Sequence, residues 1–305
     1  MFWGKTFNPE TDIGDLSGKV ILVTGGNTGL GKESVLQLAK HNPAQIFLAA
    51  RTASKAEAAI AEIKQAVPAA NVTHLPLDLS SLKSVTEAAN AFKSQSQRLD
   101  VLMNNAGIMA TPAGTTTEGY EIQFGTNHVG HAALTKLLLP TLLSTASENP
   151  SSSVRILNLS SEGHKLAPTG GINFSDLALP TCSPWTRYGQ AKLANILFSK
   201  SLAKQHPSIK SAAIHPGVIK TDLYIPYTES NIVMRLGMRV GSLFLGDVKT
   251  GAKNQLWAAT SPDLETGEYY TPVGAKSGGT SYAKDEKLAD ELWEWTEKEL
   301  QKHGI

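Results

Sequence analysis

Short apolar runs alternate with longer segments of helical period along most of the chain. Seven of the runs have the length and aliphatic content of buried strands, at 19–25, 45–50, 72–79, 99–107, 154–161, 211–217 and 267–272. Between them, apolar residues at helical spacing predict helices over 30–41, 53–66, 80–97, 118–143, 186–205, 249–260 and 285–302. This alternation is typical of repeated β-α-β units in a parallel sheet.

The order of these elements restricts the fold. Parallel crossovers are right-handed, and helices must cover both faces of a buried parallel sheet. We therefore predict an α/β fold with a doubly wound Rossmann-type sheet of about seven mainly parallel strands. No internal repeat, low-complexity tract or long linker divides the sequence, so residues 1–305 are expected to form a single domain.

Composition narrows the kind of partner. The 28 basic and 27 acidic side chains give a formal charge of +1 and form no long blocks, which argues against nucleic-acid binding and favours a small-molecule partner. Cys182 is the only cysteine, which excludes an internal disulfide. No segment has the apolar length of a signal peptide or an integral membrane span, so we expect a cytoplasmic protein.

A glycine-rich turn, TGGNTGLG at residues 24–31, joins the first predicted strand to the first predicted helix. Glycine lets the backbone bend tightly and approach a ligand, while a helix N-terminus offers free N–H groups to a phosphate. The position of this turn favours a dinucleotide site, and a plain structural turn is the simpler alternative.

Tyr188 and Lys192 lie four positions apart, and therefore on one face of the predicted helix 186–205. A lysine ammonium beside a tyrosine hydroxyl stabilises the phenolate, which lowers the tyrosine pKa from about 10 and makes it a usable general acid or base. Taken alone, the same spacing also describes a surface pair. Ser160 and Ser161 end a predicted strand at the sheet edge where ligands of this architecture bind.

Three motifs together resemble the short-chain dehydrogenase/reductase family. They are the threonine-led turn Gly25-x-x-x-Gly29-x-Gly31, the sequence Asn-Asn-Ala-Gly at 104–107 and Tyr-x-x-x-Lys at 188–192, in the family's order, and the resemblance runs from about residue 17 to 275. The long gap between Ser161 and Tyr188 and the run YGQAKLAN are similar to the retinol-dehydrogenase-related branch, which implies lipophilic carbonyls or alcohols. The missing N-terminal membrane anchor departs from that branch and argues against membrane-dissolved substrates.

The resemblance implies a nicotinamide dinucleotide, and Arg51 favours NADP(H). NAD-selective sites place a carboxylate about 20 residues beyond the glycine turn, where this chain has LAAR at 48–51 and no carboxylate. The Arg51 guanidinium suits a 2′-phosphate, and a solvated strand-end charge is the alternative. By resemblance, the other cofactor contacts are Gly25, Asn27, Gly29, Leu30, Gly31, Asp78, Leu79, Asn105, Tyr188, Lys192, Pro216, Val218 and Thr221.

The resemblance also assigns the catalytic roles, to Asn127, Ser161, Tyr188 and Lys192. In reduction, Ser161 would orient the carbonyl oxygen and Tyr188 would protonate it, while Lys192 holds the ribose and keeps the tyrosine pKa low. Asn127 would hold a water that resupplies the proton, or else it is an exposed polar residue. Ser160 is expected to be structural because Ser161 aligns better with the family's serine, and Trp185 is a candidate substrate wall.

No metal site is predicted, because the histidine pair His128 and His131 lacks a third ligand nearby. Residues 222–247 carry apolar side chains at helical spacing and are predicted to form a lid over a hydrophobic substrate. A packed or dimer-facing helix and a membrane-surface helix are the alternatives. The resemblance further implies a homodimer or homotetramer formed through the helices at 118–143 and 186–205.

The sequence thus predicts an NADP(H)-dependent oxidoreductase. It would transfer a hydride between nicotinamide and a hydrophobic or aromatic ketone or aldehyde, or the corresponding alcohol. Two alternatives remain open on the same scaffold: a reductase of carbon–carbon double bonds, and a non-catalytic dinucleotide-sensing protein.

Overall fold

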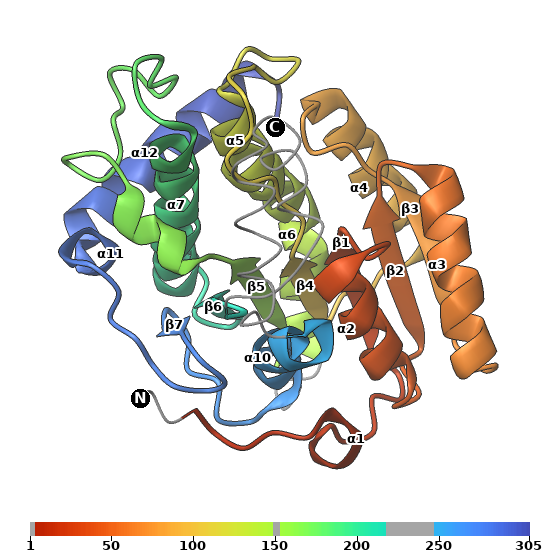
Figure 1. Ribbon diagram of the computed structural model, residues 1–305. Helices are drawn as coiled ribbons and strands as arrows, with labels where there is room; N and C mark the ends of the chain where they lie inside the picture. Colours follow the sequence, from red (N-terminus) through yellow and green to blue (C-terminus); the bar gives the residue numbers. More distant parts are fainter. Residues whose placement is uncertain (1–3, 149–152, 218–246) are drawn as a thin grey trace, which may run out of the picture.

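A seven-stranded sheet forms the centre of the protein (Figure 1). The computed structural model describes residues 4–148, 153–217 and 247–305. The strand order is β3-β2-β1-β4-β5-β6-β7, and the paired strands run parallel. The strands are β1 (Val20–Thr24), β2 (Gln45–Ala50), β3 (Val72–Pro76), β4 (Val101–Asn104), β5 (Arg155–Leu159), β6 (Lys210–Ile214) and β7 (Tyr269–Tyr270). The predicted doubly wound sheet is confirmed.

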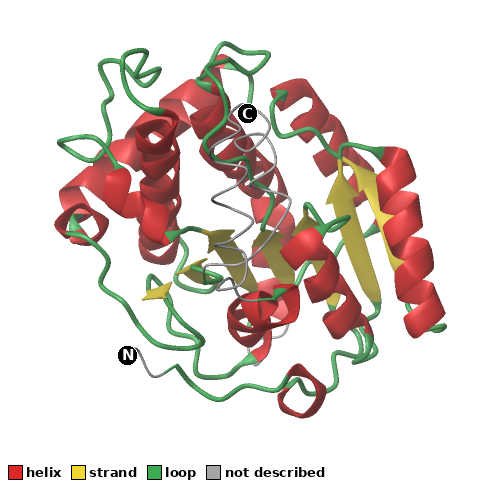
Figure 2. Ribbon diagram, viewed as in Figure 1, coloured by secondary structure: helices red, strands yellow, loops and turns green. Residues whose placement is uncertain are grey.

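Helices cover both faces of the sheet, which gives three layers (Figure 2). One face packs against α2 (Gly29–Ala39), α3 (Ala53–Ala66) and α10 (Val248–Thr260), and α1 (Pro9–Asp12) lies beside α10. The other face packs against α4 (Leu82–Gln95), α6 (Gly130–Glu148) and α7 (Pro184–Gln205), with α12 (Glu286–Lys302) across α7. The described residues also form two short helices, α5 (Ile122–Phe124) and α11 (Ser281–Lys284). A separate aliphatic core therefore fills each side of the sheet.

The predicted helix 118–143 is the element that differs most from the structure. Glu121 accepts hydrogen bonds from the N–H groups of Gln123 and Phe124, so the helix begins at Ile122 rather than at residue 118. A π-helical turn at Gly125–Val129 then separates α5 from α6, and α6 continues to Glu148. One long helical pattern thus contains a local change of register that the hydrophobic period does not reveal.

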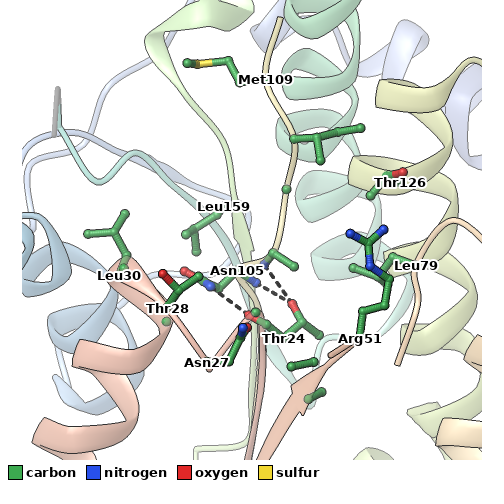
Figure 3. Close-up of a pocket in the computed structure, with 18 of the residues that line it drawn as sticks. Thr24, Asn27, Thr28, Leu30, Arg51, Leu79, Asn105, Met109, Thr126 and Leu159 are labelled. Carbon is green, nitrogen blue, oxygen red and sulfur yellow. Dashed lines mark hydrogen bonds between the residues drawn. The ribbon is translucent and has the colours of Figure 1, made fainter. Parts of the chain in front are cut away.

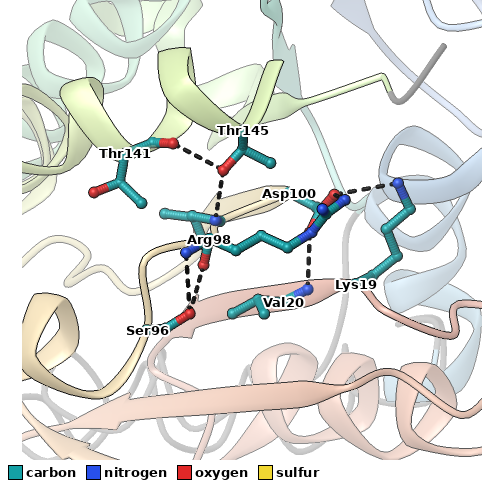
Figure 4. Close-up of polar contacts among 8 residues, drawn as sticks. Lys19, Val20, Ser96, Arg98, Asp100, Thr141 and Thr145 are labelled. Carbon is teal, nitrogen blue, oxygen red and sulfur yellow. Dashed lines mark hydrogen bonds and ion pairs between the residues drawn. The ribbon is translucent and has the colours of Figure 1, made fainter. Parts of the chain in front are cut away.

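The amino ends of the central strands meet at a buried carboxylate, Asp100 (Figure 4). It accepts hydrogen bonds from the Val20 N–H at 2.9 Å, from Arg98 Nε at 2.8 Å and Nη2 at 2.7 Å, and from Lys19 Nζ at 3.1 Å. Burial by itself raises the pKa of this carboxyl, but the hydrogen bond from Arg98 and the other donors hold it below its ordinary value. Charged groups therefore tie the amino ends of these strands together, and the cavity described below lies at their carboxyl ends.

Within the described ranges, no helix combines the length and the apolar content needed to cross a bilayer.

Candidate active site

A cavity of about 390 Å³ lies at the carboxyl ends of the strands. The segments that follow β1 to β6 each contribute to its wall, as expected for a doubly wound sheet at the point where the strand order reverses. Among the predicted site residues, those on this wall are Gly25, Asn27, Gly29, Leu30, Gly31, Arg51, Asp78, Leu79, Asn105, Ser161, Tyr188, Lys192 and Pro216. Val218, Thr221 and all of the predicted lid except Asp247 lie outside the described residues.

The glycine turn is held against the end of β4 by a threonine. Thr24 Oγ1 accepts from the backbone N–H groups of Asn105 and Ala106, each at 2.9 Å, and Asn105 Nδ2 donates to the Thr24 carbonyl at 2.8 Å (Figure 3). Gly25 adopts a φ of +65°, and a Cβ on Gly31 would lie 2.3 Å from the Gly25 carbonyl oxygen. Side chains are therefore excluded at both positions, and the backbone itself forms this part of the cavity.

Arg51 lies on the other side of the cavity from Thr28 and Leu30, close to Leu79 (Figure 3). It follows β2 directly and is exposed to solvent. Asp78 is engaged locally, because its Oδ1 accepts from the Ser80 N–H at 3.0 Å and from the Ser80 hydroxyl at 2.6 Å. This end of the cavity thus combines an exposed cation with a carboxylate fixed in a turn.

Ser161, Tyr188 and Lys192 meet in the part of the cavity next to β5. Tyr188 is only 3% exposed, and Lys192 Nζ lies 5.7 Å from the centre of its ring. A Cβ on Gly163 would lie 2.7 Å from Tyr188 Cε1 and 3.3 Å from Ser161 Oγ, so both side chains border the same glycine. The predicted serine and tyrosine therefore lie close together on the cavity wall.

Among the described residues, the Ser161 hydroxyl accepts one hydrogen bond and donates none. Its Oγ accepts from the Gly163 N–H at 3.0 Å and caps a 3₁₀ helix, η2 (Glu162–Leu166). Ser160, by contrast, is buried and donates its hydroxyl to the Lys192 carbonyl at 2.8 Å. Adjacent serines thus serve different purposes: Ser160 ties β5 to α7, and Ser161 presents a donor toward the cavity.

Lys192 is buried, and burial lowers the pKa of its ammonium group to about 8. Nζ donates to the Leu159 carbonyl at 2.9 Å, which holds the group beneath the end of β5. A cation with a pKa near neutrality exchanges its proton readily and still favours negative charge on a neighbouring phenol.

Asn127 lies behind the cavity wall, within the π-helical turn. Its Oδ1 accepts from the Ile108 N–H and its Nδ2 donates to the Ile108 carbonyl, both at 2.9 Å. A Cβ on Gly107 would lie 3.1 Å from Asn127 Oδ1 and 3.5 Å from Lys192 Nζ, so the two side chains approach the same glycine. Asn127 is buried, and the alternative of an exposed polar residue is therefore wrong.

A buried histidine links Asn127 to the glycine turn. His131 Nδ1 donates to the Asn127 carbonyl at 3.0 Å, since a carbonyl can only accept, and its Nε2 lies 2.9 Å from Thr24 Oγ1. Burial lowers the pKa of His131 to about 4, so the ring is neutral and Nε2 accepts the threonine hydroxyl. Thr24 and Asn127 are thereby joined through one imidazole.

Known proteins resemble this chain over most of its length. Residues 19–231 match the family model described as short chain dehydrogenase. The chain belongs to the short-chain dehydrogenase family. It is 42% identical to the short-chain dehydrogenase/reductase drtF of Aspergillus calidoustus, over 95% of this chain and 96% of that protein. It is 37% identical to retinol dehydrogenase 12 of Mus musculus, over 91% of this chain and 85% of the relative.

Solved structures agree with the short-chain dehydrogenase fold. An uncharacterised protein from Mycobacterium paratuberculosis superimposes with a TM-score of 0.75 and 31% identity, over 96% of this chain and 97% of that one. The RhlG/NADP complex of Pseudomonas aeruginosa gives a TM-score of 0.66 at 24% identity, over 85% and 97% of the two chains. The second likeness concerns the fold alone.

This short-chain dehydrogenase also has cavity residues that sequence reasoning missed. Lys55 and Thr52 line the wall beside Arg51, and the position of Lys55 in the first turn after the strand was the available signal for it. At the other end, Met109 and Ala110 form an apolar cluster with Tyr188, against which Trp185 packs. The Trp185 and Tyr188 rings meet edge to face at 6.3 Å. Trp185 thus lies beside Tyr188, and its role as a substrate wall stays a prediction.

The two histidines that raised the question of a metal are core residues of this short-chain dehydrogenase. His128 Nε2 lies 3.0 Å from Thr296 Oγ1, and both His128 and His131 are buried. In the part of the chain that the structure describes, no three His, Cys, Asp or Glu side chains gather as a metal site would require.

Proposed function

We propose that this short-chain dehydrogenase is NADP(H)-dependent and interconverts a hydrophobic or aromatic ketone or aldehyde with its alcohol. The observation that carries the proposal is the convergence of Ser161, Tyr188 and buried Lys192 on one cavity whose opposite end carries Arg51. A proton donor, a cation that tunes it and a hydroxyl that orients a substrate are the groups that carbonyl reduction requires.

The residues present fit a phosphorylated dinucleotide. Gly25 and Gly31 let the turn pack tightly against the end of β4, so its backbone lines the cavity at the N-terminus of α2, where free N–H groups could bind a pyrophosphate. Arg51 and Lys55 supply positive charge beside β2, where a 2′-phosphate would lie, and no carboxylate follows that strand. These features favour NADP(H) over NAD(H).

Within this proposal the bound nicotinamide supplies or accepts the hydride. In the reductive direction Ser161 donates its free hydroxyl proton in a hydrogen bond to the substrate carbonyl oxygen, because its Oγ already accepts from Gly163. Tyr188 transfers its phenolic proton to the same oxygen as negative charge develops there. Lys192 stabilises the resulting phenolate, and oxidation of the alcohol uses the same groups in reverse.

The apolar end of the cavity sets the substrate class. Met109 lines the cavity beside Tyr188, and Ala110 and Trp185 pack against these two residues. A substrate held there would bury an apolar body while its oxygen reaches the hydroxyl groups of Ser161 and Tyr188. A planar aromatic ring or an aliphatic chain gains from this burial, and a polyol does not.

The test is an assay of NADPH and NADH oxidation with a panel of aromatic, aliphatic and sugar carbonyls, and one activated alkene. We expect turnover of apolar carbonyls with NADPH. Tyr188→Phe should lose about 1,000-fold in kcat, the size of a general-acid contribution. Tyr120→Phe is the matched control, because Tyr120 does not line the cavity and donates its hydroxyl to Glu299. Equal activity of both variants, or turnover of the alkene alone, would contradict the proposal.

A further inference from the structure

The 3₁₀ helix η2 holds the position of Ser161 relative to Tyr188. A Cβ on Gly189, the residue after Tyr188, would lie 2.6 Å from the Ala167 backbone nitrogen and 2.8 Å from the Gly163 carbonyl oxygen. The start of α7 and η2 are therefore in direct backbone contact. Because Ser161 is the N-cap of η2, the position of η2 against α7 sets the distance between Ser161 and Tyr188.

His164 occupies the centre of η2 and is 1% exposed. Its Nδ1 lies 2.7 Å from the Ser161 carbonyl oxygen, and its Nε2 lies 3.3 Å from the Thr280 backbone nitrogen. The carbonyl only accepts and the backbone N–H only donates, so both contacts are made by one species, the neutral ring with its proton on Nδ1. Burial lowers the pKa of this imidazole, which agrees with a neutral ring.

The segment from β7 to α11 encloses this histidine. Tyr269 meets the His164 ring edge to face, with ring centres 5.2 Å apart, and donates its hydroxyl to Glu162 at 3.3 Å. Gly279 has a φ of +62°, and a Cβ there would lie 3.1 Å from His164 Nε2. Residues 269–280 thus contact η2 closely. In the sequence they lie beyond the region matched by the family model, which ends at residue 231.

We propose that His164 is a positioning residue that fixes Ser161 by joining its carbonyl to the C-terminal segment at Thr280. This inference rests on the proposed function, because it assigns Ser161 the role of orienting the substrate oxygen. His164 itself does not line the cavity, so its effect passes through the backbone of Ser161.

Two amide variants separate the two hydrogen bonds. In His164→Asn the side-chain amide N–H replaces Nδ1 and keeps the bond to Ser161. In His164→Gln the amide oxygen reaches the place of Nε2 and keeps only the side-chain bond to Thr280, while the backbone N–H of residue 164 still donates to the Ser161 carbonyl, as it does at 3.0 Å in the wild type. Each variant loses one buried hydrogen bond, so their melting temperatures should fall by similar amounts.

The two variants should differ in catalysis. We expect a fall in kcat of about 10- to 100-fold in His164→Gln and of about threefold at most in His164→Asn, because small displacements of a catalytic group carry large rate costs. The KM for NADPH should stay within about twofold in both, since Gly25, Gly31 and Arg51, which would hold the phosphates, follow other strands. Equal losses of kcat, or a greater loss in the asparagine variant, would overturn the proposal.

Two further measurements do not depend on turnover. In the wild type, ¹⁵N spectra should give His164 a protonated Nδ1 and an unprotonated Nε2, with the resonance assigned by its absence in His164→Asn. Crystal structures with NADP should place Ser161 Oγ within about 0.3 Å of its wild-type position in His164→Asn and farther away in His164→Gln. The opposite tautomer, or an unmoved serine in His164→Gln, would reject the positioning role. If the wild type turns over no carbonyl, the proposed function fails and these results still decide the role of His164.

Discussion

The two ends of the cavity are built on different physical grounds. The end beside β1 and β2 is formed by bare backbone, because Gly25 and Gly31 exclude side chains there. The end beside β5 is formed by buried polar side chains, of which Lys192 and Ser160 are each no more than 5% exposed. The structure of the first end depends on the shape of the backbone. The structure of the second end depends on buried hydrogen bonds, which water cannot replace in a dry interior. Mutations should therefore change the Kd for NADPH at the first end and kcat at the second.

The largest effect expected on cofactor binding and stability comes from a change in the backbone of the glycine turn. In Gly31→Ala the new Cβ would overlap the Gly25 carbonyl oxygen and lie 2.5 Å from Asn105 Nδ2, so the turn must move. We expect the Kd for NADPH to rise by about 100-fold or more and the free energy of unfolding to fall by about 3 kcal/mol. Titration of NADPH fluorescence and urea denaturation measure the two effects. Gly14→Ala is the control, because a Cβ there has no neighbour within 4 Å, and a similar loss in both would contradict the role of the turn.

The polar end should respond in kcat, and its two serines allow a matched comparison. Ser161→Ala removes a hydroxyl that faces the cavity, so we expect kcat to fall by about 100-fold. Because its Oγ also caps η2, we expect a stability loss of about 1 kcal/mol as well. Ser160→Ala removes the buried bond to the Lys192 carbonyl, so we expect a stability loss of about 1 kcal/mol and a smaller change in kcat. The reverse pattern would show that Ser160 is the substrate-orienting serine.

Acid should destabilise the protein through a buried histidine, His128, on the same side of the sheet as α7. His128 packs between Phe124 and Phe198, and burial lowers its pKa to about 3. In the unfolded chain the same ring titrates near 6.5, so below that pH the unfolded state binds more protons. Its contribution to stability is complete above about pH 6.5 and is lost as the pH falls toward 3, which amounts to about 2 kcal/mol at pH 5.

Urea denaturation at pH 7.5 and pH 5 measures this loss. In His128→Leu the difference in unfolding free energy between the two pH values should shrink by about 2 kcal/mol. His303→Leu, which changes an exposed histidine at the end of α12, serves as the control. An unchanged difference in His128→Leu would mean that the ring is not neutral in the folded protein.

The smallest expected effect concerns the edge of the backbone end. Arg51→Ala should raise the Kd for NADPH by about tenfold, equal to about 1.4 kcal/mol, because an exposed guanidinium bonds a phosphate in competition with water. The Kd for NADH should not change. Lys64→Ala makes the same change of charge at an exposed position near the end of α3 and should leave both constants unaltered. Equal weakening of both cofactors in Arg51→Ala would contradict a 2′-phosphate contact.

Much of the fold follows from the period of apolar residues, because burial on a sheet or under a helix repeats at a fixed spacing. The predicted strand 45–50 and helix 53–66 agree with β2 and α3 residue for residue. The predicted strand 72–79 is too long, since β3 ends at Pro76 and residues 77–79 turn away to line the cavity. Strand ends at a binding site keep an apolar pattern after they leave the ladder.

The cavity wall could be predicted where one short segment supplies several lining residues, as with the glycine turn and with Tyr188 and Lys192 on α7. The site was not predictable where segments far apart meet. The contact of His164 with Thr280 joins residues 116 positions apart, and no local pattern in either segment indicates the other. Likewise, the burial of Asn127 follows from its bonds to Ile108, across a loop whose path depends on the whole fold.

The π-helical turn at Gly125–Val129 has a consequence for how relatives are aligned. Such a turn holds one more residue than an α-helical turn of the same span, so it acts as an insertion hidden inside a continuous helix. An alignment without a gap against a relative that lacks the turn would displace everything on one side of it by one position. The wrong residue would then be matched to Asn127, and a genuine member of the family would be judged to lack its asparagine.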